Sequence, residues 1–465
     1  MEPVTGVPGV LSGITGHRPL RARSQSGVPR MSARPNSDRV SLGSGFQLVW
    51  GSVVMSSLGD GVRFAALPLL ATRVTSDPRL IALVLVAEQL PWLVVGPLSG
   101  VMADRFDRRR ILWITDSVRA VIAVVFTLFA ATGTVGIAVL AIAAFLFGSG
   151  QVVYSGAWAG IIPALVGPEG RTRANARLQA GSLITDTLLG APGGTLLFAW
   201  AVAAPFGVNA LCFGVAAVLM ALLPGRYRAG ETGATEDARP VRRDMAEGFR
   251  WLGKHRLLRA LCLTSGVSNL VSAGLTAVLV LFAKETLQLG STGFGLLIAS
   301  FSVGGLLGAA VAPRLSLGIG RSRTLTLALA GSALAAASAG LSSSGAVAAC
   351  MIAAYGIASV TWNVTAVSLR QDIVPGSLLG RVSMAYLMTV AGSSALGTTA
   401  GGLLAHAWGL RSPFLAGGAV LLFAAFVSRW TLSGTHDVTT DPPEGTVGSP
   451  DRVEHAVSDP GNART

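Results

Sequence analysis

The chain has 465 residues, of which 51% are hydrophobic and 13% are charged. Soluble domains carry about 25% charged residues, so this composition excludes an ordinary soluble protein and favours one that resides in a membrane. The formal net charge of +13 fits either nucleic acid or an anionic membrane surface as a partner. The placement of the basic residues decides between these two.

Twelve apolar segments are long enough to form membrane-spanning helices, each of which needs about 20 residues. We predict them at 46–71, 79–103, 110–131, 135–166, 176–203, 206–224, 258–283, 292–313, 323–341, 345–368, 380–407 and 412–432. The sequence thus predicts an all-α integral membrane fold, with twelve transmembrane helices in two pseudo-symmetric six-helix halves. The predicted parts are a disordered basic arm (1–45), the first half (46–224), a cytoplasmic central loop (225–257), the second half (258–432) and a disordered tail (433–465).

The basic residues collect on one side of the predicted membrane when both termini are placed in the cytoplasm. The opposite side then receives Arg73, Arg79, Lys284 and Arg411. Lysine and arginine beside membrane helices are retained on the cytoplasmic side. The pattern therefore predicts a multi-pass protein of the plasma (inner) membrane with both termini inside, and it assigns the net charge to membrane lipids rather than to nucleic acid.

The two halves also resemble one another at an offset of 208 residues. The matching pairs are Arg173 with Arg381, Gly193 with Gly401, Gly194 with Gly402, Trp200 with Trp408, and Pro205 with Pro413. Parallel repeats of six helices are a transporter architecture that holds a substrate between the halves near the midplane. The repeat thus predicts a transporter of a small molecule.

One short charged segment, GVMADRFDRRR from Gly100 to Arg110, resembles the loop between helices 2 and 3 of the major facilitator superfamily, written GxxxDRxGRR. It matches at Gly100, Asp104, Arg105, Arg108 and Arg109. The second glycine of the pattern is replaced by an aspartate here. The stretches GDGVRFAALPLLA, AEGFRWLGKHRLLRAL and GRVSMAYL are similar to the branch that includes the enterobactin exporter, which implies an efflux carrier.

The resemblance implies that Asp104 bridges the loop arginines to the start of the eleventh helix, near Gly380 and Arg381. Such a latch would hold the cytoplasmic face closed, since a carboxylate is favoured at a helix N-terminus and arginine forms bidentate bonds. The alternative is that the arginines only set orientation and bind lipid headgroups. The matching loop of the second half has Leu317 in place of the acid.

Six charged residues fall inside predicted spans, where a charge is costly and therefore indicates function. They are Asp60, Arg63, Glu88, Asp116, Arg119 and Asp186. We favour Asp60 and Glu88 as proton carriers. The alternatives for Asp60 are an ion pair with Arg63 and a capping role at the flanking glycines, and the alternative for Glu88 is a buried hydrogen-bonded group. Asp116 and Arg119 lie three residues apart on one helix face and are expected to pair structurally. Asp186 fits either role.

The fifth predicted helix partly resembles the glycine and proline motif of facilitator antiporters. Its matching residues are Gly181, Gly190, Pro192, Gly193 and Gly194. Simple close packing of helices is the alternative. The fourth helix carries Gln151 where many proton antiporters keep an intramembrane arginine, a departure from the usual proton relay.

Aromatic and polar side chains on predicted inner helices are candidates to line an amphipathic cavity. They are Gln151, Tyr154, Trp158, Tyr355, Trp362, Asn363 and Tyr386. Packing or anchoring at the membrane interface is the alternative for each aromatic residue.

The sequence therefore predicts a monomeric secondary transporter that exports a small amphipathic compound, such as a drug, siderophore or secondary metabolite, in exchange for protons. The alternatives are uniport or symport of a nutrient and a non-transporting sensor with a carrier fold. The sequence has no GxxxxGK[ST] phosphate loop, HExxH helix or GxSxG elbow, so we expect neither a nucleotide-driven pump nor an enzyme. No cofactor or metal is expected.

Overall fold

The structure is a computed structural model, and it describes residues 43–158, 160–166, 168–225, 227, 250–374 and 379–432. The predicted arm at 1–45 and tail at 433–465 lie almost wholly outside these residues, as does most of the predicted loop at 225–257. The side chains of Asp104 and Arg381 also lie outside the described part. The proposed latch between them is therefore not described.

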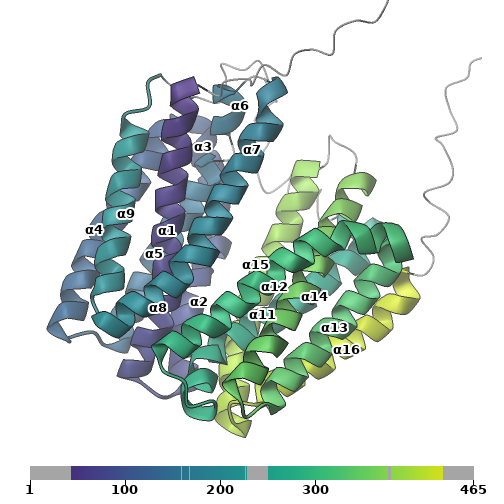
Figure 1. Cartoon of the computed structure of the whole chain (residues 1–465). Helices are drawn as coiled ribbons and strands as arrows, with labels where there is room; N and C mark the ends of the chain where they lie inside the picture. Colours follow the sequence, from purple (N-terminus) through teal and green to yellow (C-terminus); the bar gives the residue numbers. More distant parts are fainter. Residues whose placement is uncertain are drawn as a thin grey trace, which may run out of the picture. The chain divides into compact units, whose positions relative to one another are not determined.

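The first group of helices comprises α1 to α9 (Figure 1). Its elements are α1 (Gly43–Val74), α2 (Pro78–Val94), α3 (Gly96–Arg105), α4 (Arg108–Thr132), α5 (Ile137–Trp158), α6 (Ile161–Leu165), α7 (Pro168–Leu183), the π-helix η1 (Ile184–Gly190), α8 (Ala191–Trp200) and α9 (Ala204–Ala221). Helix α1 packs against α7, η1, α8 and α9, while α4 packs against α5 and α9. Helix α1 is thus the central element of this group.

The second group comprises α11 to α16. Its elements are α11 (Arg256–Leu281), the π-helix η2 (Phe282–Thr286), α12 (Ser291–Ile319), α13 (Arg321–Leu341), α14 (Gly345–Ile373), α15 (Leu379–Trp408) and α16 (Ser412–Leu432). The most extensive packing is of α12 on α14, α11 on α15, and α13 on both α14 and α16. Across the groups, α2 packs on α15 and α8 packs on α12.

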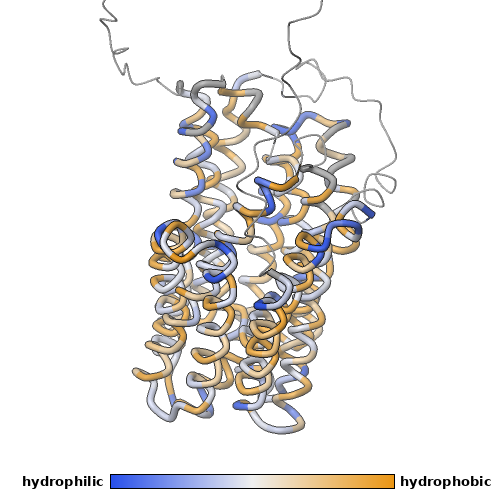
Figure 2. The backbone as a smooth tube through the Cα atoms, turned by 90° about the vertical axis from the view of Figure 1, so that its right-hand side faces the viewer, coloured by the Kyte–Doolittle hydropathy of each residue, from blue (hydrophilic) through white to orange (hydrophobic). Residues whose placement is uncertain are grey.

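Within the described residues, nine helices are long and apolar enough to span a membrane. Hydrophobic residues run along the helices, and hydrophilic ones gather mainly toward the helix ends (Figure 2). Many large apolar side chains on the outside are exposed, such as Leu211, Leu263 and Phe423. A surface of this kind suits hydrocarbon rather than water.

Three predicted helices are interrupted, and proline accounts for two of the breaks. The predicted second span divides at Val95 into α2 and α3, with Pro97 in the first turn of α3. The predicted fifth span contains η1, which ends two residues before Pro192. Proline lacks the amide hydrogen that the preceding turn needs, so the helix breaks or changes its hydrogen-bond register there. The predicted fourth span ends as α5 at Trp158, and α6 follows separately.

The helix bundle has two ends, the Gly43 end and the Asp77 end. The Gly43 end carries the start of α1 and the link between α3 and α4, and the Asp77 end carries the link between α1 and α2. The described hydrogen bonds and ion pairs that cross between the groups lie near the Asp77 end or the middle of the helices. They are Lys284 Nζ to the Thr72 carbonyl oxygen at 3.2 Å, Gln89 Nε2 to Thr398 Oγ1 at 2.9 Å, and His406 Nδ1 to Asp77 Oδ1 at 3.6 Å.

Candidate functional site

An ion-pair chain begins at Arg63, about two thirds of the way along α1. Its side chain is only 4% exposed, and its Nη1 lies 2.7 Å from Glu88 Oε1 on α2. Its Nη2 lies 3.4 Å from Asp60 Oδ1, one turn earlier on α1. Arg63 therefore holds an acid on its own helix and one on a neighbouring helix. The ring of Phe147 lies against the same guanidinium, 4.8 Å from its carbon to the ring centroid.

The chain continues through Arg119 of α4, whose side chain is fully buried. Its Nη2 donates to Asp60 Oδ1, and to Gln151 Oε1 of α5 at 3.0 Å. Its Nη1 lies 3.5 Å from Asp116 Oδ1. The predicted pair of Asp116 with Arg119 is present, but it is one part of a network in which Arg119 joins two acids. An arginine from the third predicted span thus lies beside Gln151 of the fourth.

A serine and a phenylalanine also contact Arg119. Ser56 of α1 lies between Asp116 and Arg119, with its Oγ 3.3 Å from an atom of each. The guanidinium carbon lies 3.9 Å from the centroid of the Phe213 ring on α9. A buried guanidinium is tolerated when carboxylates, hydrogen-bond acceptors and a ring face surround it. Four helices therefore contribute to the setting of this one charge.

Asp186 differs from the other acids because it has no ion-pair partner among the described residues. It lies in η1, the seven-residue π-helix. Its backbone packs directly against Gly61 of α1, where a Cβ atom would overlap the Asp186 carbonyl oxygen. Single π-helical turns are frequent at functional sites. Here the π-helix and the glycine contact together fix where Asp186 lies.

The glycines of the predicted antiporter motif form much of the interface with α1. Gly181 lies against Trp50, Gly190 against Gly61, and Gly194 against Val62. Gly193 has open space around it. Three of these four glycines therefore permit the close approach of α1 to α7, η1 and α8.

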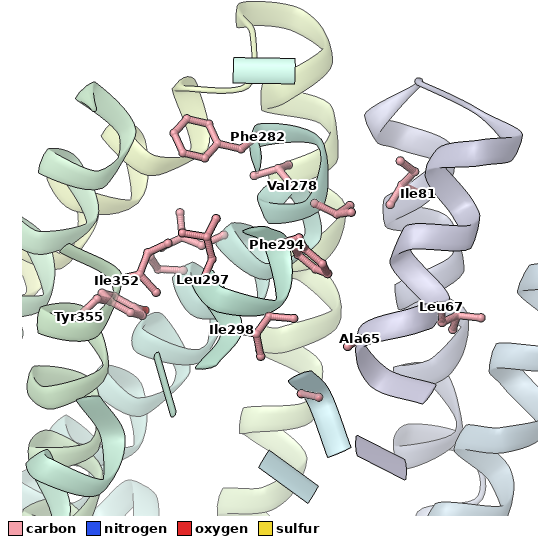
Figure 3. Close-up of a cluster of buried hydrophobic side chains, with 14 of the residues drawn as sticks. Ala65, Leu67, Ile81, Val278, Phe282, Phe294, Leu297, Ile298, Ile352 and Tyr355 are labelled. Atoms are coloured by element: carbon pink, nitrogen blue, oxygen red, sulfur yellow. The ribbon is translucent and has the colours of Figure 1, made fainter. Parts of the chain in front are cut away.

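A cavity of about 420 Å³ lies between the two groups of helices, a volume in the range typical of small-molecule sites. The first group supplies Asp60, Arg63, Phe64, Pro68, Leu85, Gln151, Asp186, Thr187 and Ala191 to its lining. The second group supplies Ser272, Leu275, Thr276, Leu279, Phe294, Ile298, Phe301, Ser302, Ala336, Ala339, Ile352, Tyr355 and Phe414. Figure 3 shows the apolar cluster to which Phe294, Ile298, Ile352 and Tyr355 belong.

Two of the seven predicted cavity residues, Gln151 and Tyr355, line this cavity. The other five lie elsewhere. Tyr154 and Trp158 pack in or against a separate apolar cluster of the first group, and Trp362 is buried in the main core. Asn363 is exposed. The ring of Tyr386 lies 4.1 Å from the guanidinium carbon of Arg370.

The basic segment between α3 and α4 is bound within its own group of helices. Arg105 is exposed, and Arg108 Nη1 donates to the Gly160 carbonyl oxygen at 2.8 Å. Arg109 donates to the carbonyl oxygens of Met220, Ala221 and Gly225. Arginine is favoured at such a site because the last carbonyl groups of a helix lack partners and carry partial negative charge.

Asp107, which replaces the second glycine of the family pattern, caps the start of α4. Its side chain accepts from the Arg109 backbone N–H at 3.0 Å and from the Tyr227 backbone N–H at 3.4 Å. Sequence reasoning missed this role, although an aspartate just before a helix is a known capping signal. It also missed Ser56 and Gly61. The Gly-Asp-Gly run around Asp60 was the available sign of close packing there.

The comparisons with known proteins agree with this architecture. A family model described as a transmembrane secretion effector of the major facilitator superfamily matches residues 42–445. The uncharacterised MFS-type transporter YfiS of Bacillus subtilis (strain 168) is 27% identical over 415 residues, which cover 83% of this chain and 92% of YfiS. The lysophospholipid transporter LplT of Yersinia pestis (strain Pestoides F) is 27% identical over 265 residues, which cover 56% of this chain and 62% of LplT.

Solved transporter structures share the fold. A bacterial homolog of the human lysosomal transporter Spinster, inward-facing and occupied, has a TM-score of 0.67 at 14% identity, covering 83% of this chain and 96% of that one. A bacterial homologue of the iron transporter ferroportin, in an inward-facing state, has a TM-score of 0.65 at 19% identity, covering 84% and 98%. Because the family model matches most of the chain, the chain belongs to the transmembrane secretion effector family of major facilitator transporters and is a multi-pass membrane protein.

Proposed function

We propose that this transporter exports a small amphipathic compound across the plasma membrane in exchange for protons. The observation that carries the proposal is the cavity between the two helix groups, which Asp186 and the ion-paired Asp60 both line. A carboxyl group that faces a cavity at membrane depth can bind and release a proton as the cavity changes the side to which it opens.

The net charge of a cluster of side chains in the first helix group supports proton coupling. Four acids and two arginines take part: Asp60, Glu88, Asp116 and Asp186, with Arg63 and Arg119. If all were ionised, this cluster would carry two uncompensated negative charges, four minus two. Uncompensated charge is costly inside a membrane. Protons or a bound cation would therefore stabilise the cluster.

Among the acids, Asp186 is the best candidate to exchange protons with the cavity. Arg63 holds Glu88, and Arg63 and Arg119 share Asp60, whereas Asp186 has no such partner among the described residues. The charges of Asp60 and Glu88 are compensated by arginine, whereas an unpaired carboxylate in a membrane needs a proton or another cation. We therefore propose Asp186, rather than Asp60 or Glu88, as the proton carrier.

We propose that the Gly43 end faces the cytoplasm, because the basic residues of the sequence collect there. The contacts of Lys284 with Thr72 and of His406 with Asp77 would then close the outer side. The closed outer side corresponds to the inward-facing stage of an alternating-access cycle. The latch of Asp104 with Arg381, the monomeric state and the contact with membrane lipids remain parts of this proposal.

Purified protein reconstituted in liposomes tests the proposal. A pH gradient of either sign should drive transport of an amphipathic test compound against its own gradient. The variant Asp186→Asn should lose this pH-driven accumulation, while a neutral amphipathic compound, which needs no carboxylate for binding, should still exchange between the two faces at zero gradient. Accumulation by Asp186→Asn at the wild-type level would contradict the role of Asp186.

The same assay separates export from the alternatives. Protons and compound moving in the same direction would indicate symport, and exchange that is indifferent to pH would indicate a uniporter. Lysophospholipids are worth including as test compounds, because LplT is named as their transporter and a single acyl chain suits the apolar wall of the cavity. Absence of any transport by folded protein would favour the non-transporting sensor.

A further inference from the structure

We propose that the substrate is an organic cation, an amine or onium group on an apolar body, and that Asp186 binds its charge. This inference rests on the proposed function, since it names the substrate class of the same cavity. It narrows the predicted range of substrates. Multiply anionic compounds, including anionic siderophores, are excluded.

The first observation is that the charged residues of the cavity lie on one wall. Asp60, Arg63 and Asp186 all come from the first group of helices. Among the described residues, the wall formed by the second group has hydroxyl groups as its polar atoms, on Ser272, Thr276, Ser302 and Tyr355, and no charged side chain. A ligand that fills the cavity must therefore present its charge to the first group and an apolar surface to the second.

The second observation is that the positive charges at this wall are already engaged. Arg63 is 4% exposed and lies 2.7 Å from Glu88. Arg119 is fully buried and contacts both Asp60 and Asp116. An anionic ligand would have to compete with these carboxylates for either guanidinium, and a displaced carboxylate would be left uncompensated in a buried site. Breaking a buried pair in this way is strongly unfavourable.

The negative charge of Asp186 is in the opposite situation. It lines the cavity, and among the described residues it takes part in no ion pair. Arg63, which acts on it at longer range, is already paired with Asp60 and Glu88. A cationic ligand would supply the missing counter-charge, as a proton does in the empty cavity. Proton and substrate would then compete for one carboxyl group, which is the simplest basis for exchanging one for the other.

The third observation concerns the apolar wall. Phe294, Phe301, Tyr355 and Phe414 contribute rings to it, and Phe301 and Tyr355 lie with their ring centroids 6.1 Å apart. Aromatic faces attract organic cations and also pack well against flat apolar bodies. The composition of this wall therefore suits the same ligand class as the charge of Asp186.

Two nearly isosteric ions of opposite charge test the proposal, tetraphenylphosphonium and tetraphenylborate. Equilibrium binding to the purified protein should favour the phosphonium by at least about tenfold, a difference of about 1.4 kcal/mol. Asp186→Asn should abolish this preference. Asp372→Asn is the matched control, because it makes the same change on an exposed acid that pairs with Arg321 outside the cavity; it should leave the preference intact.

Equal or tighter binding of the borate by the wild type would overturn the inference, and so would a preference that survives in Asp186→Asn. A thermal melt near that of the wild type shows that the variant is folded. Proton coupling is measured separately by transport. Proton-coupled transport of a neutral amphiphile, together with no preference for binding the phosphonium, would refute the cationic substrate and leave the proposed function standing. Cation-selective binding without pH-driven transport would refute only the proton coupling.

Discussion

The contact between Gly61 and η1 predicts the effect of adding a single methyl group to α1. In Gly61→Ala the new Cβ would overlap the carbonyl oxygen of Asp186, and the Gly61 Cα is already close enough that a Cβ on Gly190 would lie 2.9 Å from it. Backbone atoms cannot rotate away as a flexible side chain can. The overlap is therefore relieved only if α1 and η1 separate.

Two opposing terms set the size of the effect on stability. Alanine favours a helix over glycine by about 1 kcal/mol, and overpacking costs about 1–3 kcal/mol. We therefore expect a net loss of up to about 2 kcal/mol. The functional loss should be larger, since a displacement of about 1 Å in a positioned group can cost on the order of 100-fold in rate. We expect transport to fall about tenfold or more, because Asp186 moves with η1.

The assay is the initial rate of pH-driven transport in liposomes, normalised to the amount of folded protein inserted. Gly193→Ala is the matched control, because it adds the same methyl group to a nearby glycine of α8 that has open space around it. The control should transport at the wild-type rate. Wild-type transport by Gly61→Ala, with an unchanged dependence on pH, would refute the argument that this glycine positions Asp186.

Two further predictions concern the buried arginine and the Asp77 end. Arg119→Gln should destabilise the fold by about 3–5 kcal/mol, the range for breaking a buried pair, because Asp60 and Asp116 lose a shared partner. Adding Asp116→Asn should recover part of the thermal stability. If it recovers none, Arg119 does not stabilise the fold through Asp116. At the other site, Arg79 holds the pKa of Asp77 below its usual range by hydrogen bonding, so Asp77 keeps its charge until the pH falls through that lowered value, and its stabilising contribution is lost only there. In a His406→Gln background, which removes the imidazole that contacts Asp77 and that could itself change charge in this range, spin labels at Ser76→Cys and Arg411→Cys should therefore show no Asp77-dependent change in distance between roughly pH 5 and 8. A change in that window that Asp77→Asn removes would contradict the assignment.

The sequence predicted the helices well because membrane spans depend on length and composition. The start and end of α13 and α16 lie close to the predicted 323–341 and 412–432. The interruptions at Val95 and η1 were missed, although Pro97 and Pro192 were visible. Proline is tolerated in many membrane helices, so its presence alone does not indicate where a helix breaks.

The sequence indicated the charged residues and the two pairs within one helix, Asp60 with Arg63 and Asp116 with Arg119, but not the partners on neighbouring helices. Arg63 lies closer to Glu88 than to Asp60, and Arg119 contacts Gln151 as well as Asp116. Pairing across helices depends on how each helix is rotated about its axis, and the sequence does not fix this rotation. For the same reason the sequence did not indicate which aromatic residues face the cavity: Tyr355 lines it, whereas Tyr154, Trp158, Trp362 and Tyr386 do not. Helices that are apolar on every side, such as α5, give little sign of which face points inward.

The cap formed by Asp107 and the contacts of Arg109 have a mechanical consequence for any latch at the Gly43 end. The start of α4 is bound through Asp107 to the backbone of Tyr227, and through Arg109 to the last carbonyl groups of α9. The link between α3 and α4 is therefore held by hydrogen bonds to α9, which packs against both α1 and α4. If the Gly43 end closes, the start of α4 moves together with α9. Because α9 packs against α1, this movement is passed to α1 and to Asp60, the acid that α1 carries.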